Sequence, residues 1–228
     1  MPTVLVTGAN RGLGLEFVRQ YAAEGWTVHA CCRDPGAAKA LEAVKGDITI
    51  HGLDVGDRAS VTALARALKS TPIDVLINNA GVYGGDRDGQ TFGKVDDGAW
   101  DACLRTNALG PLMVTEALID NVARGASKVI ACVTSKMGSM ADNTSGGAYI
   151  YRASKAALNA VIVSLARDLK GRATVIAFHP GWVQTDMGGR GAPIKPPESI
   201  AGMRKVIAGA KPSDSGRFLN YDGASIPW

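Results

Sequence analysis

Short apolar runs alternate with longer amphipathic segments along the chain. The apolar runs, rich in β-branched residues, predict strands over 3–7, 27–32, 48–52, 75–78, 128–133, 174–179 and 218–221. Between them, apolar residues at helical spacing predict helices over 12–24, 35–44, 58–70, 100–123, 150–169 and 197–208. Strands that alternate with helices favour parallel βαβ units. We therefore predict an α/β fold, a doubly wound parallel sheet of about seven strands, in a single domain over 1–228.

Composition narrows the class of protein. Of the 228 residues, 46% are hydrophobic and 20% are charged, which is typical of a soluble globular protein. No apolar run approaches the roughly 20 residues that span a bilayer, so we expect no membrane partner. The net charge of +4 comes without a block of Lys or Arg, so we expect no nucleic-acid partner. The chain opens directly on a strand and shows no secretory signal, so we expect a cytoplasmic protein.

The cysteines and histidines do not form a metal-binding pattern. Four cysteines occur without Cys-x-x-Cys spacing, and the three histidines lie far apart in the sequence. Cys31 and Cys32 are adjacent in a predicted strand, so their side chains should point to opposite faces of the sheet. We expect buried, reduced thiols, structural imidazoles and no metal site.

The first predicted strand leads into a glycine-rich turn, and a helix begins inside that turn. Its pattern is Thr-Gly-x-x-x-Gly-x-Gly, formed by Gly8, Gly12 and Gly14. The more usual Gly-x-Gly-x-x-Gly fingerprint fails, because Phe17 stands at its third glycine. Glycines here allow a tight turn and a close approach of the backbone to a pyrophosphate, which the helix N-terminus attracts. An ordinary glycine-rich turn is the alternative to this Rossmann-like nucleotide site.

A tyrosine and a lysine lie four residues apart in a predicted helix. Tyr151 and Lys155 therefore share one helix face, and Ser135 precedes them by sixteen positions. A free phenol has a pKa of about 10, and a neighbouring cation lowers it toward working pH. Such a tyrosine could donate a proton to a carbonyl oxygen. A half-buried tyrosine beside a solvated lysine explains the same spacing without chemistry.

Taken together, these motifs resemble the short-chain dehydrogenase/reductase family over nearly the whole chain. Certain segments are similar to its carbonyl-reductase-like and C-factor-like branch. The family's motifs occur in its usual order: Thr7-Gly8-Ala9-Asn10-Arg11-Gly12-Leu13-Gly14, Asn78-Asn79-Ala80-Gly81, Asn107, Ser135, Tyr151 with Lys155, and Pro180-Gly181. The branch is indicated by the segments 151–159, 179–183 and 221–228.

The resemblance implies a mechanism of carbonyl reduction. Tyr151 would donate the proton, and Ser135 would hydrogen-bond and orient the carbonyl oxygen. Lys155 would lower the pKa of Tyr151 and hold the nicotinamide ribose. Asn107 would anchor a water that links Lys155 to solvent, although an asparagine that satisfies a helix kink is an alternative. The sixteen-residue spacing exceeds that common in the family, and the excess falls in a Gly-, Ser- and Asn-rich loop over 138–148.

The end of the second strand indicates which cofactor is used. In the resembled family an acid that binds the ribose of NAD usually ends this strand, where this chain has Cys32. An arginine that pairs with the 2′-phosphate of NADP follows it, where this chain has Arg33. Arg11 is a second cation suited to that phosphate. We therefore predict NADP(H), with Asp34 on the ribose of NAD as the alternative.

Further cofactor contacts follow from the same resemblance. Asp54 and Val55 would contact the adenine, although a helix-capping aspartate explains Asp54 as well. Thr185 and the backbone of Val183 would contact the nicotinamide carboxamide or the phosphates. Trp182 and Met187 either line the site or belong to the core. The remaining predicted cofactor residues are Gly8, Asn10, Gly12, Leu13, Gly14, Asn79, Ala80, Gly81, Tyr151, Lys155, Pro180 and Gly181.

Three functions are consistent with these residues. The first is NADPH-dependent reduction of an aldehyde or ketone, and its partner is a small carbonyl or alcohol substrate. The second is a dinucleotide-binding signalling or sensor protein, since some relatives of the C-factor kind act in developmental signalling. The third is an NAD-dependent secondary-alcohol dehydrogenase. Family members often pair through the helices predicted at 100–123 and 150–169, which would give a homodimer or homotetramer.

Overall fold

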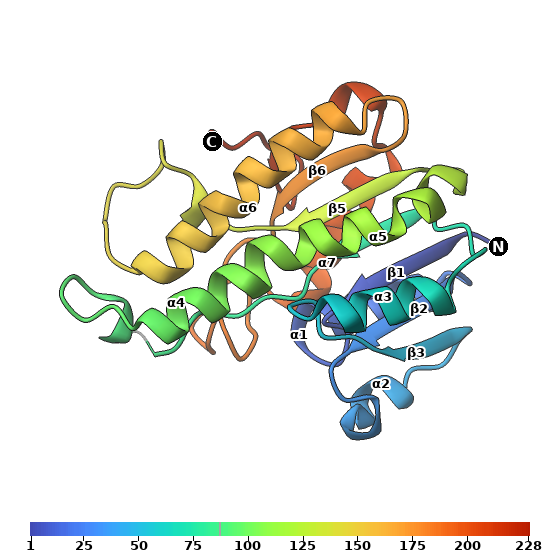
Figure 1. Ribbon diagram of the computed structural model, residues 1–228, viewed down its shortest axis with the longest axis horizontal. Helices are drawn as coiled ribbons and strands as arrows, with labels where there is room; N and C mark the ends of the chain where they lie inside the picture. The colour runs from blue at the N-terminus through green and yellow to red at the C-terminus, as the bar shows by residue number, and fades with distance from the viewer. Residues whose placement is uncertain (87) are drawn as a thin grey trace.

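The protein is built on one sheet of seven parallel strands (Figure 1). The computed structural model describes residues 1–86 and 88–228. The strands run in the order β3-β2-β1-β4-β5-β6-β7, and every pair is parallel. They are β1 (Thr3–Thr7), β2 (Thr27–Cys32), β3 (Ile48–Gly52), β4 (Val75–Asn78), β5 (Val129–Val133), β6 (Thr174–His179) and β7 (Phe218–Asn220). The predicted doubly wound α/β fold is confirmed.

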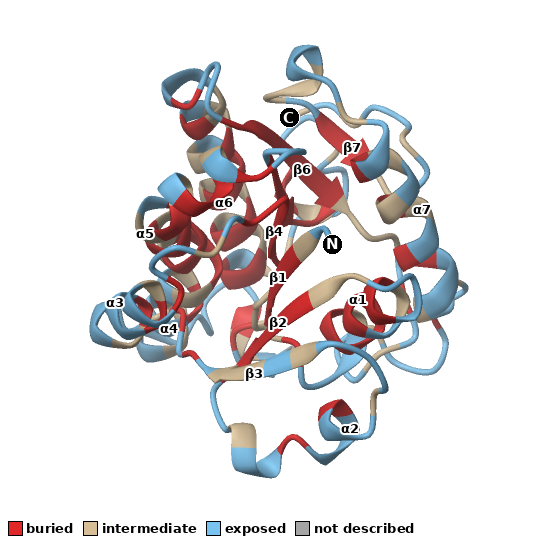
Figure 2. Cartoon of the chain, turned by 90° about the vertical axis from the view of Figure 1, so that its right-hand side faces the viewer, coloured by how far each residue is buried: buried red, intermediate tan, exposed pale blue. Residues whose placement is uncertain are grey.

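Helices cover both faces of this sheet. Figure 2 shows α3, α4, α5 and α6 on one face, and α1 and α7 on the other. The helices are α1 (Gly12–Ala23), α2 (Lys39–Glu42), α3 (Arg58–Ala67), α4 (Asp97–Leu104), α5 (Gly110–Arg124), α6 (Tyr149–Asp168) and α7 (Pro196–Ala208). Among these described helices, none is long and apolar enough to cross a membrane.

Alternation along the strands creates two hydrophobic cores. In β1, Val4 and Val6 pack into the core beneath α1 and α7, while Leu5 packs into the core on the α3–α5–α6 side. This follows from the period of two in a strand, in which successive side chains point to opposite faces. Cys31 and Cys32 separate between the two cores in the same way, and both are buried free thiols, as predicted.

The strand order reverses between β1 and β4. Chain connections leave these two neighbouring strands in opposite directions, so a crevice forms beyond their carboxyl ends. The glycine-rich turn follows β1, and the segment 79–83 follows β4. The fold therefore brings two of the predicted motifs together at the point where doubly wound sheets bind ligands.

Two predicted helices differ from the structure. The helix predicted over 35–44 is instead a 3-10 turn, Pro35–Ala37, followed by the single turn of α2. Asp34 caps that turn, since its Oδ1 accepts a hydrogen bond from the Ala37 N–H at 3.2 Å. The helix predicted over 100–123 is interrupted by a π-helical turn, Arg105–Leu109. Pro111 has no N–H to donate to the Asn107 carbonyl, so a regular α-helix cannot continue there.

Candidate active site

The glycine-rich turn lies against the end of β4. Gly8 and Gly12 have positive φ angles of 65° and 53°, which favour glycine. A Cβ on Gly14 would overlap the Gly8 carbonyl oxygen, so only glycine fits this close turn. The Asn79 amide donates hydrogen bonds to the Thr7 carbonyl at 2.9 Å and to the Gly8 carbonyl at 3.2 Å. Asn79 thus fastens the turn to the neighbouring strand.

The N-terminus of α1 is suited to an anion. Arg11 occupies the N-cap position, and no side chain among the described residues caps this helix. The first-turn N–H groups therefore point toward the crevice with the positive end of the helix dipole. Thr185 lies beside Gly12, and the Arg11 guanidinium pairs with Asp186 at 3.1 Å. These donors and the glycine cradle fit the pyrophosphate of a dinucleotide.

The residues predicted to select the cofactor lie at the end of β2. Arg33 is exposed, while Cys32 is buried. The Asp34 carboxylate already accepts the hydrogen bond that caps the following turn. Two residues after β3, the Asp54 carboxylate accepts a hydrogen bond from the Gly56 N–H at 2.9 Å, so it closes a local turn. This arrangement favours Arg33 over Asp34 as the residue that meets a ribose substituent.

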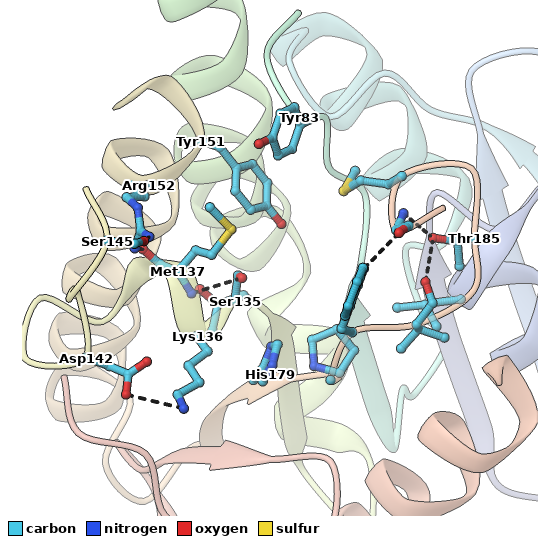
Figure 3. A pocket seen from close by; sticks show the side chains of 18 of the residues that line it. Tyr83, Ser135, Lys136, Met137, Asp142, Ser145, Tyr151, Arg152, His179 and Thr185 are labelled. Carbon is cyan, nitrogen blue, oxygen red and sulfur yellow. Dashed lines mark hydrogen bonds and ion pairs between the residues drawn. The ribbon is translucent and has the colours of Figure 1, made fainter. Parts of the chain in front are cut away.

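A cavity of about 500 Å³ opens beyond the carboxyl ends of β4, β5 and β6. Ser135 and Tyr151 both line it, and Figure 3 shows both side chains directed into it. The longer spacing between them therefore does not prevent them from meeting. The other lining residues are Leu13, Tyr83, Thr134, Lys136, Met137, Asp142, Thr144, Ser145, Arg152, His179, Pro180, Gly181, Trp182, Val183, Thr185, Met187 and Gly188.

Local structure places the serine and the tyrosine. Ser135 follows β5 and caps a 3-10 turn, since its Oγ accepts a hydrogen bond from the Met137 N–H at 3.1 Å. Tyr151 lies in the first turn of α6 and is 8% exposed. Burial raises the pKa of Tyr151 to about 12, and the nearby Ser135 hydroxyl partly opposes this rise. The prediction that the tyrosine has a depressed pKa is wrong for this structure.

Lys155 is anchored to the last residue of β5. Its Nζ donates a hydrogen bond to the Val133 carbonyl at 3.0 Å and lies 5.8 Å from the centroid of the Tyr151 ring. The lysine is 4% exposed, and burial lowers its pKa to about 8. Burial of both groups, rather than attraction between them, therefore dominates their ionisation.

The buried lysine predicts a pH dependence of stability. Between pH 8 and its ordinary pKa of 10.5, Lys155 holds more protons in the unfolded chain than in the folded one. Burial of the charged lysine therefore lowers the free energy of unfolding by its full amount below pH 8. This loss disappears as the pH rises through the window and the folded protein becomes more stable. Urea unfolding of the wild type and Lys155→Met should show a difference in unfolding free energy that changes by a few kcal/mol across it.

Lys170→Met removes an exposed lysine two residues beyond the end of the same helix and is the matched control. The wild type must be compared with Lys155→Met because burial also raises the pKa values of Cys31 and Cys132. These thiols lower the stability of both proteins at alkaline pH, and the comparison cancels their effect. A difference between the wild type and Lys155→Met that stays constant from pH 7.5 to pH 10.5 would contradict the buried-lysine assignment.

Asn107 lies in the π-helical turn and is fully buried. Its Oδ1 accepts a hydrogen bond from the Val82 N–H, and its Nδ2 donates to the Val82 carbonyl, both at 2.8 Å. The residue therefore sits at the kink, and its role as the anchor of a water beside Lys155 stays a prediction. A Cβ on Gly81 would lie 3.2 Å from the Asn107 Oδ1 and 3.5 Å from the Lys155 Nζ.

The loop over 138–148 forms one wall of the cavity. The Arg152 guanidinium donates hydrogen bonds to the Ser145 hydroxyl at 2.9 Å, the Gly146 carbonyl at 3.2 Å and the Met137 carbonyl at 3.3 Å. Trp182 also lines the cavity, and its exposed fraction of 56% excludes it from the core. Met187, which is 46% exposed, lines the cavity as well.

Sequence reasoning missed several residues of the site. Tyr83 lies only two positions beyond Gly81, in the segment that follows β4. Because ligands bind beyond the carboxyl ends of the strands, that position could have predicted a place in the site. His179 ends the predicted strand 174–179 and carried the same signal. Arg152 gave none, since its contacts depend on the course of the loop over 138–148, and neither did Gln90, which contacts Tyr151 from 61 positions away. Among the described residues, no three potential metal ligands are grouped, although His29 and His51 meet across adjacent strands with 2.9 Å between their ring nitrogens.

A glycine-rich turn at the switch point of a doubly wound sheet places this chain among the nucleotide-binding α/β enzymes. Residues 2–193 match the sequence model of the short chain dehydrogenase family, and the chain belongs to this family of oxidoreductases. The family predicted from the order of the motifs is therefore confirmed.

Curated relatives include a signalling protein and a dehydrogenase. The chain is 48% identical to the C-signal of Myxococcus xanthus over 167 residues, which are 73% of this chain and 99% of that protein. It is 38% identical to 1-hydroxy-2-glutathionyl-2-methyl-3-butene dehydrogenase from a Rhodococcus species, in an alignment of 236 positions that covers 100% of both chains.

Solved structures of carbonyl reductases are similar over their full length. The carbonyl reductase Sniffer of D. melanogaster has a TM-score of 0.90 and 32% identity, with 100% of both chains covered. An NADPH-bound carbonyl reductase from chicken fatty liver has a TM-score of 0.91 and 34% identity, with 100% of this chain and 99% of that chain covered.

Proposed function

We propose that this protein reduces the carbonyl group of an aldehyde or ketone to an alcohol with NADPH. The observation that carries the proposal is the convergence of the Tyr151 and Ser135 side chains on one cavity. Leu13 of the glycine-rich turn and Thr185 line the same cavity, so the nucleotide site and the proton donor are adjacent. The similarity to NADPH-bound carbonyl reductase supports the choice of reaction.

The proposed cofactor residues surround the crevice at the switch point. NADPH, when bound, supplies the hydride for the carbonyl carbon. The first turn of α1 would hold its pyrophosphate, and the guanidinium groups of Arg11 and Arg33 would hold its 2′-phosphate. Asp54 and Val55 would contact the adenine. The other proposed contacts are Gly8, Asn10, Gly12, Leu13, Gly14, Asn79, Ala80, Gly81, Tyr151, Lys155, Pro180, Gly181, Val183 and Thr185.

The raised pKa of Tyr151 suits reduction. A phenol with a pKa of about 12 is protonated at neutral pH, so it is ready to donate. An alkoxide forming on the substrate is a stronger base than a phenolate, so the proton moves to it readily. Ser135 would hydrogen-bond the carbonyl oxygen and stabilise its developing charge. Lys155 would hold the nicotinamide ribose, and Asn107 would anchor a water beside it.

The cavity favours an apolar carbonyl compound. Aromatic and thioether side chains of Tyr83, Trp182, Met137 and Met187 line much of it. Such walls bind a hydrophobic body while Ser135 and Tyr151 orient its one polar group. We expect aromatic or branched aldehydes and ketones to be better substrates than short polar ones.

NADPH consumption with a panel of aldehydes, ketones and quinones tests the proposal. Turnover of apolar members would support it. Tight NADPH binding without turnover of any member would contradict it and would favour a dinucleotide sensor. That second function rests on the 48% identity to the C-signal of M. xanthus. A pure sensor has no need of a buried tyrosine at the cavity, and this favours the reductase.

A further inference from the structure

A fully buried glutamine lies behind the candidate proton donor. Gln90 ends a short 3-10 turn, Asp88–Gln90, in the connection between β4 and α4, and it is 0% exposed. Its Nε2 donates a hydrogen bond to the Tyr83 carbonyl, and its Oε1 accepts one from the Tyr151 N–H, both at 2.8 Å. A buried amide is costly unless it is hydrogen-bonded, and here both of its polar atoms are engaged.

The N-terminus of α6 explains why Tyr151 needs this partner. The N-cap residue, Ala148, has a positive φ of 47° and provides no side-chain cap. The first backbone bond within the helix runs from the Arg152 N–H to the Ala148 carbonyl at 2.9 Å. The Tyr151 N–H therefore has no partner inside the helix. Gln90 supplies the cap from a position 61 residues away.

The same amide also fixes a second aromatic residue of the cavity. The rings of Tyr83 and Tyr151 are in contact, with centroids 4.9 Å apart and planes inclined by 32°. Figure 3 shows the two rings side by side at one edge of the cavity. Gln90 binds the backbone beneath each ring, so it links the wall of the site to the proton donor.

We propose that Gln90 is a positioning residue, which sets the Tyr151 hydroxyl beside Ser135 and holds Tyr83 against it. This inference rests on the proposed function, since it concerns the donor of that reaction. Loss of the clamp lets the first turn of α6 and the Tyr83 segment shift. Small misplacements of reacting groups lower turnover by up to about 100-fold, whereas a cofactor held mainly by the elements around β1 and β2 is affected much less.

The test compares two substitutions of Gln90 with a matched control. Gln90→Met keeps the length of the side chain and removes both hydrogen bonds, so kcat should fall about 10- to 100-fold while the Kd for NADPH changes by much less than this factor. Asn121→Leu is the control. Asn121 is a buried amide on α5, a helix that does not line the cavity, and its Nδ2 donates hydrogen bonds to the Leu68 and Thr71 carbonyls. That variant should lose stability and keep kcat.

Gln90→Glu separates positioning from general stability. A protonated carboxyl can accept from the Tyr151 N–H and donate to the Tyr83 carbonyl, as the amide does. An ionised carboxylate cannot donate. We therefore expect near wild-type kcat at acidic pH and a fall as the buried carboxyl ionises, in contrast to the wild-type pH profile. A constant ratio of kcat between Gln90→Glu and the wild type across this range would overturn the proposal, even if Gln90→Met does not fold.

A measurement without substrate distinguishes this inference from the proposed function. In protein labelled with 3-fluorotyrosine, the ¹⁹F resonances of Tyr83 and Tyr151 should shift in Gln90→Met, while that of Tyr221 should not. Unchanged resonances at Tyr83 and Tyr151 would overturn the proposal. Failure of the wild type to reduce any carbonyl compound would instead contradict the proposed function, and the resonances would still test the clamp.

Discussion

Replacing Tyr151 with phenylalanine should lower carbonyl reduction by about 10²- to 10⁴-fold and leave NADPH binding close to its wild-type strength. The substitution removes one hydroxyl and retains the ring that packs against Tyr83. A positioned general acid contributes about this factor, because without it the developing alkoxide must take its proton from solvent. The buried hydroxyl has its pKa raised to about 12, so the wild type holds the proton over the whole neutral range. Initial rates and a fluorescence titration with NADPH would measure both effects.

Tyr149→Phe is the matched control for this experiment. Tyr149 lies two residues away on the same helix, is 43% exposed and does not line the cavity. Four positions after it stands Ala153, so it also lacks the lysine that follows Tyr151. Its variant should turn over substrate at the wild-type rate. Full activity in Tyr151→Phe, with wild-type NADPH binding, would remove Tyr151 as the proton donor.

Motifs with fixed spacing were predictable from the sequence, because local geometry determines them. Tyr151 and Lys155 are four residues apart, and any helix brings them to one face. Ser135 and the glycine-rich turn follow buried strands, and the carboxyl ends of parallel strands meet at one edge of the sheet. The short apolar runs predicted all seven strands for the same reason, because such a run is a local feature of the sequence.

Features that depend on tertiary contacts were predicted less well. The pKa of Tyr151 was expected to be low because its charged neighbour is visible in the sequence, whereas its burial depends on Tyr83 and on distant loops. Gln90 was missed because its partner lies 61 residues away. The break at Arg105–Leu109 had a local signal in Pro111, but apolar periodicity continues across it and hides the interruption.

Replacing Arg33 with aspartate should weaken NADPH binding by about 100-fold and leave NADH binding nearly unchanged. Arg33 is exposed at the end of β2, where the proposed site holds the ribose of the adenosine half. A charge-assisted hydrogen bond is worth about 1.5–3 kcal/mol, and about 1.4 kcal/mol corresponds to a tenfold change in Kd. An aspartate would also repel the 2′-phosphate of NADPH, while NADH has only a hydroxyl at that position. Titration of each nucleotide by isothermal calorimetry would give the ratio of the two Kd values.

Asp34→Asn is the matched control, because it changes the adjacent charge and keeps an oxygen that can cap the following turn. If Asp34 bound the ribose of NAD, this variant would lose NADH affinity and Arg33→Asp would not weaken NADPH selectively. Under the proposed assignment Asp34→Asn should change neither Kd appreciably, since the Asp34 carboxylate accepts a hydrogen bond from the Ala37 N–H and does not bind the nucleotide. The two variants therefore separate an NADPH-dependent reductase from an NAD-dependent alcohol dehydrogenase. Equal losses of NADPH and NADH in Arg33→Asp would favour the dehydrogenase, because only a contact common to both nucleotides would then have been removed.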